Sequence, residues 1–306
     1  MGIILGNNRQ IEFKLNNAKK FAASGKFLHA SQLYKSLIEE FPDNAEPYFQ
    51  LAQLYQDQNL SKESENLLLN YLNENPDRID VIIYLAQIYL KSSKWNEVVE
   101  ILTPVTPDEE PYALFLIGYA YFMLEDYEIA KINFENFLKF NNEPELFYET
   151  QLFLSKIYLA QSKFNKALEY AEKSEKFYSN YWELKFIYAE IYLSTKMINH
   201  AIKNIETCIK MSTANYKVYK LAGEIYYKAK NYIKSEKYFV ECISLNENQS
   251  TYLYIKLADI CIKNKKIDKA VNYYDLVLKM NSKHNIALKG KKNALSLLKN
   301  QNTYNE

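Results

Sequence analysis

The chain has 306 residues, 48% of them hydrophobic, and its 38 Lys and Arg nearly balance its 37 Asp and Glu. Only 6 Gly and 7 Pro are present, which excludes a loop-rich protein and predicts an all-α fold. No stretch reaches the roughly 18–20 uninterrupted apolar residues of a membrane helix, and the first residues lack the pattern of a secretory signal. We therefore expect a cytoplasmic location.

A regular period organises the chain after an N-terminal extension, expected over residues 1–10. From 11 to 299, one column of mostly aromatic residues recurs about every 34 positions, at Phe21, Tyr55, Tyr89, Tyr121, Tyr158, Tyr192, Tyr226 and Cys261. Small residues recur three positions before this column and nine positions after it. Because two helices cross closely only where their side chains are small, each period predicts two helices joined by a tight turn.

The periods begin near residues 11, 45, 79, 111, 148, 182, 216 and 251, which makes eight repeats. One helix pair cannot bury its apolar faces alone, so the pairs are expected to stack on one another. A closing helix over 285–299 is more basic than the others and is expected to cap the stack toward solvent. Residues 300–306 are expected to form a flexible tail.

The pattern resembles the tetratricopeptide repeat (TPR). Segments YFQLAQLY (48–55), IIYLAQIY (82–89) and LFLIGYAY (114–121) are similar to the first helix of that repeat, and KALEYA (166–171) is similar to the second. The resemblance covers nearly the whole chain. It implies a right-handed α-solenoid superhelix of stacked antiparallel helix pairs, in which the first helices line a concave groove that binds partners.

The fourth repeat contains the least polar segment of the chain, PYALFLIGYAYFML, at 111–124. It is too short for a membrane span, so it is either a buried helix or a helix with a face covered by a partner. Leu114, Ile117, Gly118 and Tyr121 form one stripe, which is expected to pack inside the repeat. The opposite face is expected to line the groove.

We predict an apolar binding groove that runs from the third to the sixth repeat and is centred on the fourth. Its residues are Ile83, Leu90, Tyr112, Phe115, Tyr119, Phe122, Met123, Leu152, Leu159, Phe186 and Leu193. Neighbouring first helices also touch one another, so the same side chains would alternatively seal that contact. The sequence leaves both arrangements open.

Charge is unevenly distributed along the chain. Residues 1–150 carry 12 basic and 23 acidic residues, whereas residues 151–306 carry 26 and 14. Charged groove ends are expected, acidic at Glu46, Asp57 and Asp80 and basic at Lys217, Lys220 and Lys228. The hypothesis is that they orient a bound segment with its basic part toward the acidic end. The alternative is a solvated surface without such a role.

No catalytic, cofactor or metal site is expected. The glycines form no phosphate-binding loop, and His29, His200 and His284 are far apart in the sequence. Cys208 and Cys242 occupy the same column in adjacent repeats, too far apart for a disulfide. The lysine–asparagine clamp with which some tetratricopeptide repeats bind acidic C-terminal tails is absent from the matching positions.

The predicted function is a non-enzymatic scaffold for protein–protein interaction, binding a peptide or an amphipathic helix of a partner. One alternative is a self-assembling structural protein, in which acidic N-terminal and basic C-terminal halves join into a homo-oligomer. Another is a regulatory module of an enzyme or nucleic-acid complex. Lysines cluster at 263–269 and 289–292, but without arginines or flanking aromatic readout, nucleic-acid binding is not favoured.

Overall fold

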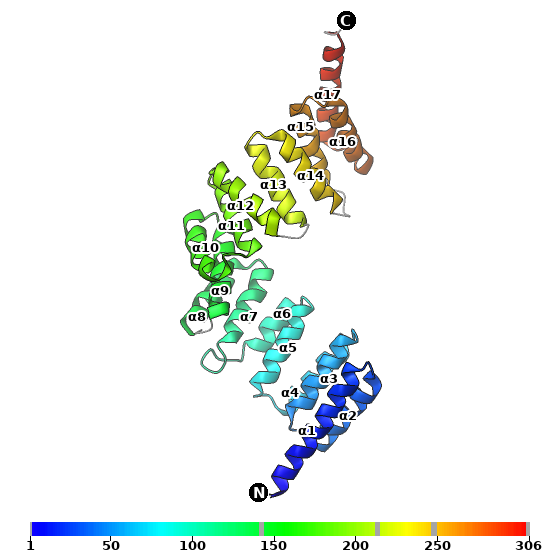
Figure 1. Cartoon of the computed structure of the whole chain (residues 1–306), viewed down its shortest axis with the longest axis vertical. Helices are drawn as coiled ribbons and strands as arrows, with labels where there is room; N and C mark the ends of the chain where they lie inside the picture. The colour runs from blue at the N-terminus through cyan, green and yellow to red at the C-terminus, as the bar shows by residue number, and fades with distance from the viewer. Residues whose placement is uncertain (1, 141–143, 212–214, 246–249, 304–306) are drawn as a thin grey trace. The chain divides into compact units, whose positions relative to one another are not determined.

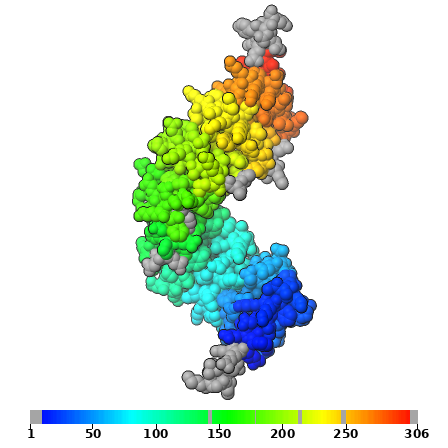
Figure 2. Space-filling view, viewed as in Figure 1, coloured from blue at the N-terminus to red at the C-terminus, as the bar shows by residue number. Residues whose placement is uncertain are grey.

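The computed structural model describes residues 2–140, 144–211, 215–245 and 250–303, which form seventeen α-helices and no strand (Figure 1). The all-α prediction is therefore confirmed. The chain divides into two compact units, residues 1–142 and 143–306. Within each unit successive helix pairs abut one another, as the space-filling view shows (Figure 2).

Unit 1 contains four helix pairs. They are α1 (Gly2–Ala23) with α2 (Phe27–Glu40), α3 (Ala45–Asp57) with α4 (Ser61–Glu74), α5 (Ile79–Lys91) with α6 (Trp95–Leu102), and α7 (Tyr112–Met123) with α8 (Tyr127–Phe140). Each second helix also packs on the first helix of the next pair. Helix α1 includes most of the expected N-terminal extension.

Unit 2 contains four further pairs and a closing helix. They are α9 (Pro144–Ala160) with α10 (Phe164–Tyr178), α11 (Trp182–Ser194) with α12 (Ile198–Met211), α13 (Tyr216–Lys228) with α14 (Tyr232–Ser244), α15 (Thr251–Lys263) with α16 (Ile267–Met280), and α17 (Asn285–Thr303). Helix α17 packs on α16 and α15. It continues into the expected tail, of which 304–306 lie outside the described residues.

The small-residue columns mark the points where paired helices cross. Ala52 and Ser64 are fully buried at the crossing of α3 and α4, and the Ser64 hydroxyl donates a hydrogen bond to the Ala52 carbonyl at 3.0 Å. Ser235 donates to the Gly223 carbonyl in the same way at 2.8 Å. A serine at this position thus bonds the facing backbone because the helices approach so closely. The predicted stacking of helix pairs is confirmed within each unit.

The turns inside the pairs share one backbone conformation that the sequence does not advertise. Each of the eight has a residue with positive φ, and only the first of these, Gly25, is a glycine; the others are Asn59, Ser93, Glu125, Ser162, Lys196, Lys230 and Lys265. The next residue donates its N–H to the carbonyl of the aromatic column, as Leu60 does to Tyr55 at 2.8 Å. This bond is the helix-ending Schellman pattern. It keeps the turn short even where glycine is absent.

Candidate functional site on the first helices

Six of the seven groove residues predicted in unit 1 remain at least partly accessible. They are Ile83, Leu90, Tyr112, Tyr119, Phe122 and Met123, which we call the apolar face. Met123 is 41% exposed, and the other five are half-buried. The apolar face lies on α5 and α7, the first helices of the third and fourth repeats.

The prediction was wrong for Phe115, which is only 7% exposed. Its ring centroid lies 5.5 Å from that of Phe137 and 5.8 Å from that of Phe134, both on α8. A Cβ on Gly118 would lie 3.0 Å from the Phe134 ring, so the glycine lets this ring approach α7 closely. Phe115 therefore belongs to the core between α7 and α8.

Helix α7 has a different rotation about its axis from the one expected. Leu114, Ile117 and Tyr121, expected in the core, are half-buried, whereas Phe115 and Leu116 are buried. The helix has no charged residue and no polar face that would favour one orientation. Packing against the rings of α8 decides its rotation instead.

The rings of the apolar face are held by neighbouring aromatic side chains. Tyr119 meets Trp95 of α6 edge to face with centroids 6.0 Å apart, and Tyr112 stacks on Phe115 at 5.8 Å. Phe122 packs against Tyr127 of α8 at 5.7 Å. A bound segment would thus meet side chains that have already lost much of their rotational freedom, which lowers the entropic cost of binding.

Each acidic residue predicted at a groove end has a partner within unit 1. Glu46 pairs with Lys19 at 3.1 Å, and Asp57 accepts a hydrogen bond from the Gln53 amide at 2.7 Å. Asp80 binds Arg78 through both carboxylate oxygens, at 3.0 and 2.8 Å. These acids are therefore part of local networks of unit 1.

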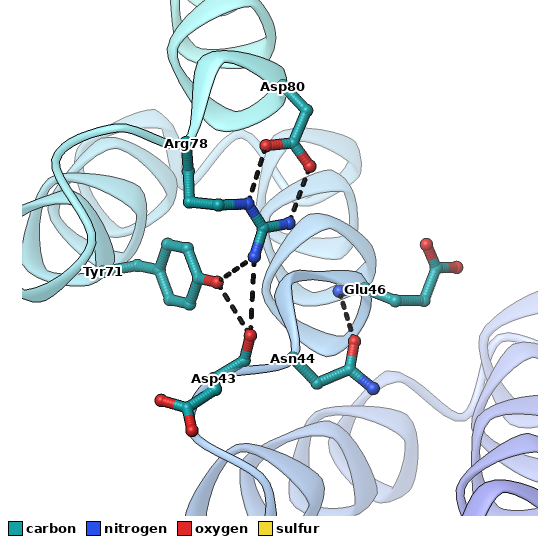
Figure 3. A network of polar contacts seen from close by, with 6 residues as sticks. All are labelled: Asp43, Asn44, Glu46, Tyr71, Arg78 and Asp80. Atoms are coloured by element: carbon teal, nitrogen blue, oxygen red, sulfur yellow. Dashed lines mark hydrogen bonds and ion pairs between the residues drawn. The ribbon is translucent and has the colours of Figure 1, made fainter.

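Arg78 connects three consecutive helices of unit 1 (Figure 3). Besides Asp80 on α5, its guanidinium donates to the Tyr71 hydroxyl of α4 at 2.7 Å. The Tyr71 hydroxyl in turn donates to the Asp43 carbonyl before α3 at 3.0 Å. Tyr71 is almost fully buried, so its hydroxyl needs these partners. The pKa of Asp80 lies below its ordinary value because of the hydrogen bonds from Arg78.

We expect Arg78→Ala to lower the free energy of unfolding by about 1–2 kcal/mol, because it removes a charged donor from a buried hydroxyl. Asp80→Asn should cost less, about 0–1 kcal/mol, since an exposed ion pair contributes little. Urea unfolding followed by circular dichroism measures both. Equal losses in the two variants would contradict the central role of the contact between Arg78 and Tyr71.

In unit 2 the prediction was wrong for Leu152, which is 3% exposed. It packs in a cluster with Leu184, Ile187 and Tyr188 of α11. Leu152 thus seals the contact between two first helices, the alternative that the sequence left open. The remaining predicted residues of this unit, Leu159, Phe186 and Leu193, are half-buried.

Charged and tyrosine side chains dominate the first helices of unit 2. We call this set the charged face; it comprises Lys156, Glu183, Glu190, Lys217, Lys220, Glu224, Tyr227, Lys228, Tyr252 and Lys256. Lys156 of α9 pairs with Glu183 of α11 at 3.2 Å. Sequence analysis placed lysines here but assigned no role to Glu183, Glu190, Glu224 or Tyr252.

Tyrosines and lysines alternate across α13 and α15. The Tyr252 hydroxyl donates to the Glu224 carboxylate at 3.0 Å. The Lys256 ammonium lies 5.0 Å from the Tyr227 ring centroid and 5.6 Å from that of Tyr252, and Lys220 lies 5.6 Å from the same Tyr252 ring. Cation–π attraction therefore holds two of the lysines over tyrosine rings, while Lys217 and Lys228 extend into solvent.

Glu190 of α11 differs from the other acids of the charged face. Among the described residues no donor bonds to its carboxylate and no cation lies within ion-pair distance. Burial raises its pKa to about 7, although Lys156 and Lys217 act to lower it and Glu224 raises it further. A carboxylate held in this way gains from any cation brought to it. In the sequence, its only signal is an acid between Phe186 and Leu193.

Other kinds of site find no support in the parts of the chain that the structure describes. No three His, Cys, Asp or Glu side chains there come together as metal ligands. No helix there combines the length and apolar character of a membrane span. All three cysteines are buried as free thiols, and burial raises the pKa of Cys208 to about 12, so they act as small core residues.

Comparison with known proteins identifies the repeat. Models of the tetratricopeptide repeat match residues 21–81, 216–249 and 251–284. The TPR repeat-containing protein YpiA of Bacillus subtilis (strain 168) is 26% identical over 140 residues, which are 45% of this chain and 33% of that protein. The chain thus spans about a third of the length of this curated relative.

Solved structures of similar fold include a chain of the APC/C hetero-tetramer Cut9–Hcn1, with a TM-score of 0.63 and 14% identity over 88% of this chain and 52% of that one. A tetratricopeptide repeat protein from Parabacteroides merdae has a TM-score of 0.58 and 17% identity over 83% and 99% of the two chains. At these identities the likeness shows the fold. Together with the repeat columns and the family models, it establishes that the chain belongs to the tetratricopeptide repeat proteins.

Proposed function

We propose that the chain is a non-enzymatic scaffold that binds a segment of a partner protein, as a peptide or an amphipathic helix, on its first helices. Repeats of this family generally serve as scaffolds for protein–protein interaction. The observation that carries the proposal is the apolar face, where large apolar side chains remain partly exposed in fixed orientations. Half-exposed aromatic side chains of this kind are enriched in binding hot spots.

The apolar face is centred on α7, so the proposed site keeps the fourth repeat as its centre, without Phe115. Tyr112, Tyr119 and Met123 follow one another at intervals of seven and four residues, which places them on one stripe of α7. Ile83 and Leu90 form a second stripe on α5, seven residues apart. An amphipathic helix with apolar residues at matching intervals has the shape and chemistry to cover these two stripes.

The test is quantitative capture of partner proteins from an extract by the immobilised chain and by Tyr112→Ser/Met123→Ser. We expect the variant to lose a specific protein that the natural chain retains, with affinity for it reduced at least about tenfold, or 1.4 kcal/mol. Circular dichroism should show the variant folded, because neither side chain is buried.

The matched control is Ile129→Ser/Ile132→Ser, which removes two exposed apolar side chains of α8 outside the apolar face. This control should retain the partner. A partner that survives the first pair of substitutions, or is lost equally with the control, would contradict the proposed site.

A further inference from the structure

Helix α17 is packed on one side only. Every earlier first helix, from α1 to α15, packs against its own second helix, whereas no second helix packs on α17 among the described residues (Figure 1). Ala287 and Ala294 of α17 are fully buried on the side that faces α16 and α15. The flank that a second helix would cover is open.

The open flank repeats positions that are buried elsewhere. Leu288 and Leu295 stand one repeat after Tyr254 and Cys261 of α15, which are 8% and 0% exposed because α16 covers them. On α17 the two leucines are 45% and 42% exposed. They therefore form a short apolar stripe of the kind that normally receives a second helix.

Lysines surround this stripe. The two leucines line a shallow groove of about 480 Å³ together with Lys291, Lys292, Ser296 and Lys299. No acidic side chain lines it, and Lys291 is held in place by Asp275 of α16 at 2.5 Å. Lys292 stands where α15 has the fully buried Ala258, so an occupant must accommodate a long cationic side chain at the crossing point.

We propose that the groove on α17 binds an acidic amphipathic helix of another protein, which packs along α17 as the second helix of a ninth repeat would. Its apolar stripe covers Leu288 and Leu295. Its acidic residues pair with Lys292 and Lys299, whose aliphatic stems add apolar contact beside the leucines. This site is separate from the apolar face of α5 and α7, so it stands whether or not the proposed function above is correct.

The test uses a fluorescein-labelled synthetic peptide of about 20 residues, long enough to form a helix. Leucines recur every three or four positions along one stripe, and glutamates flank them. A comparison peptide has lysine in place of every glutamate. Fluorescence anisotropy with the full chain should show saturable binding of the acidic peptide and at least roughly tenfold weaker binding of the lysine peptide.

Matched variants of the same helix locate the site. Leu288→Asp and Leu295→Asp should each weaken binding of the acidic peptide at least roughly tenfold. Leu297→Asp, a leucine that is 41% exposed outside the groove, should leave it unchanged. Lys292→Glu, which removes no apolar contact, should weaken binding of the acidic peptide and strengthen that of the lysine peptide. Circular dichroism checks that each variant is folded.

Three results would overturn the proposal. The acidic peptide does not bind saturably, both peptides bind equally well, or Leu297→Asp weakens binding as much as Leu288→Asp does. A fourth is a dimer of the chain alone in sedimentation experiments that Leu288→Asp dissociates, because the groove would then be occupied by a second copy.

Discussion

Phe115→Ala should lower the free energy of unfolding of unit 1 by about 3–5 kcal/mol, the usual cost of removing a buried aromatic ring. The ring lies between Phe134 and Phe137 of α8 with centroids within 6 Å, and alanine would leave a cavity beside them. Urea unfolding followed by circular dichroism measures the loss.

Met123→Ala is the matched control for this experiment. Met123 lies on the same helix but is 41% exposed, so its substitution should change stability by no more than about 0.5 kcal/mol. If Phe115→Ala proved as stable as the control, the ring would face solvent and the groove predicted from sequence would regain its central residue.

The burial of Phe115 also changes how binding must be tested. A variant that combines Phe115→Ala with Phe122→Ala would lose partner binding through loss of the fold of α7 and α8. It would therefore say nothing about the apolar face. Substitutions at Tyr112 and Met123 avoid this difficulty because both side chains are already partly accessible.

Glu190→Gln should stabilise unit 2 in a pH-dependent manner. Burial raises the pKa of Glu190 to about 7 from an ordinary value of 4.5, a difference worth about 3 kcal/mol. Between these values the folded chain binds a proton that the unfolded chain has released, so this group makes stability fall as pH rises through the window. Glutamine removes the charge and therefore the loss.

The measurement is urea unfolding at about pH 5 and about pH 8. The variant should exceed the natural chain by up to about 3 kcal/mol at the higher pH and by little at the lower one. Glu241→Gln, on the exposed side of α14, is the control and should show no such difference. A stability gain that is the same at both pH values would mean that Glu190 is ionised throughout.

The sequence by itself determined the repeat and the helix pairs. The small and aromatic columns recur at fixed distances because helices can cross closely only at small side chains, and Ala52 with Ser64 or Gly223 with Ser235 lie at the predicted crossings. The turns were less visible. Lys196 and Glu125 adopt positive φ without being glycines, so only the hydrogen bond to the aromatic column shows why the chain turns there.

Only the tertiary structure decided which side chains of the first helices remain accessible. Residue spacing places Phe115 and Leu152 on a stripe of a helix, but it does not set how the helix rotates against its neighbours. Helix α7 lacks a polar face, so the rings of α8 choose its rotation, and α11 covers Leu152. The same holds for Glu190, because a carboxylate is desolvated by side chains that are distant in sequence and come together only when the helices stack.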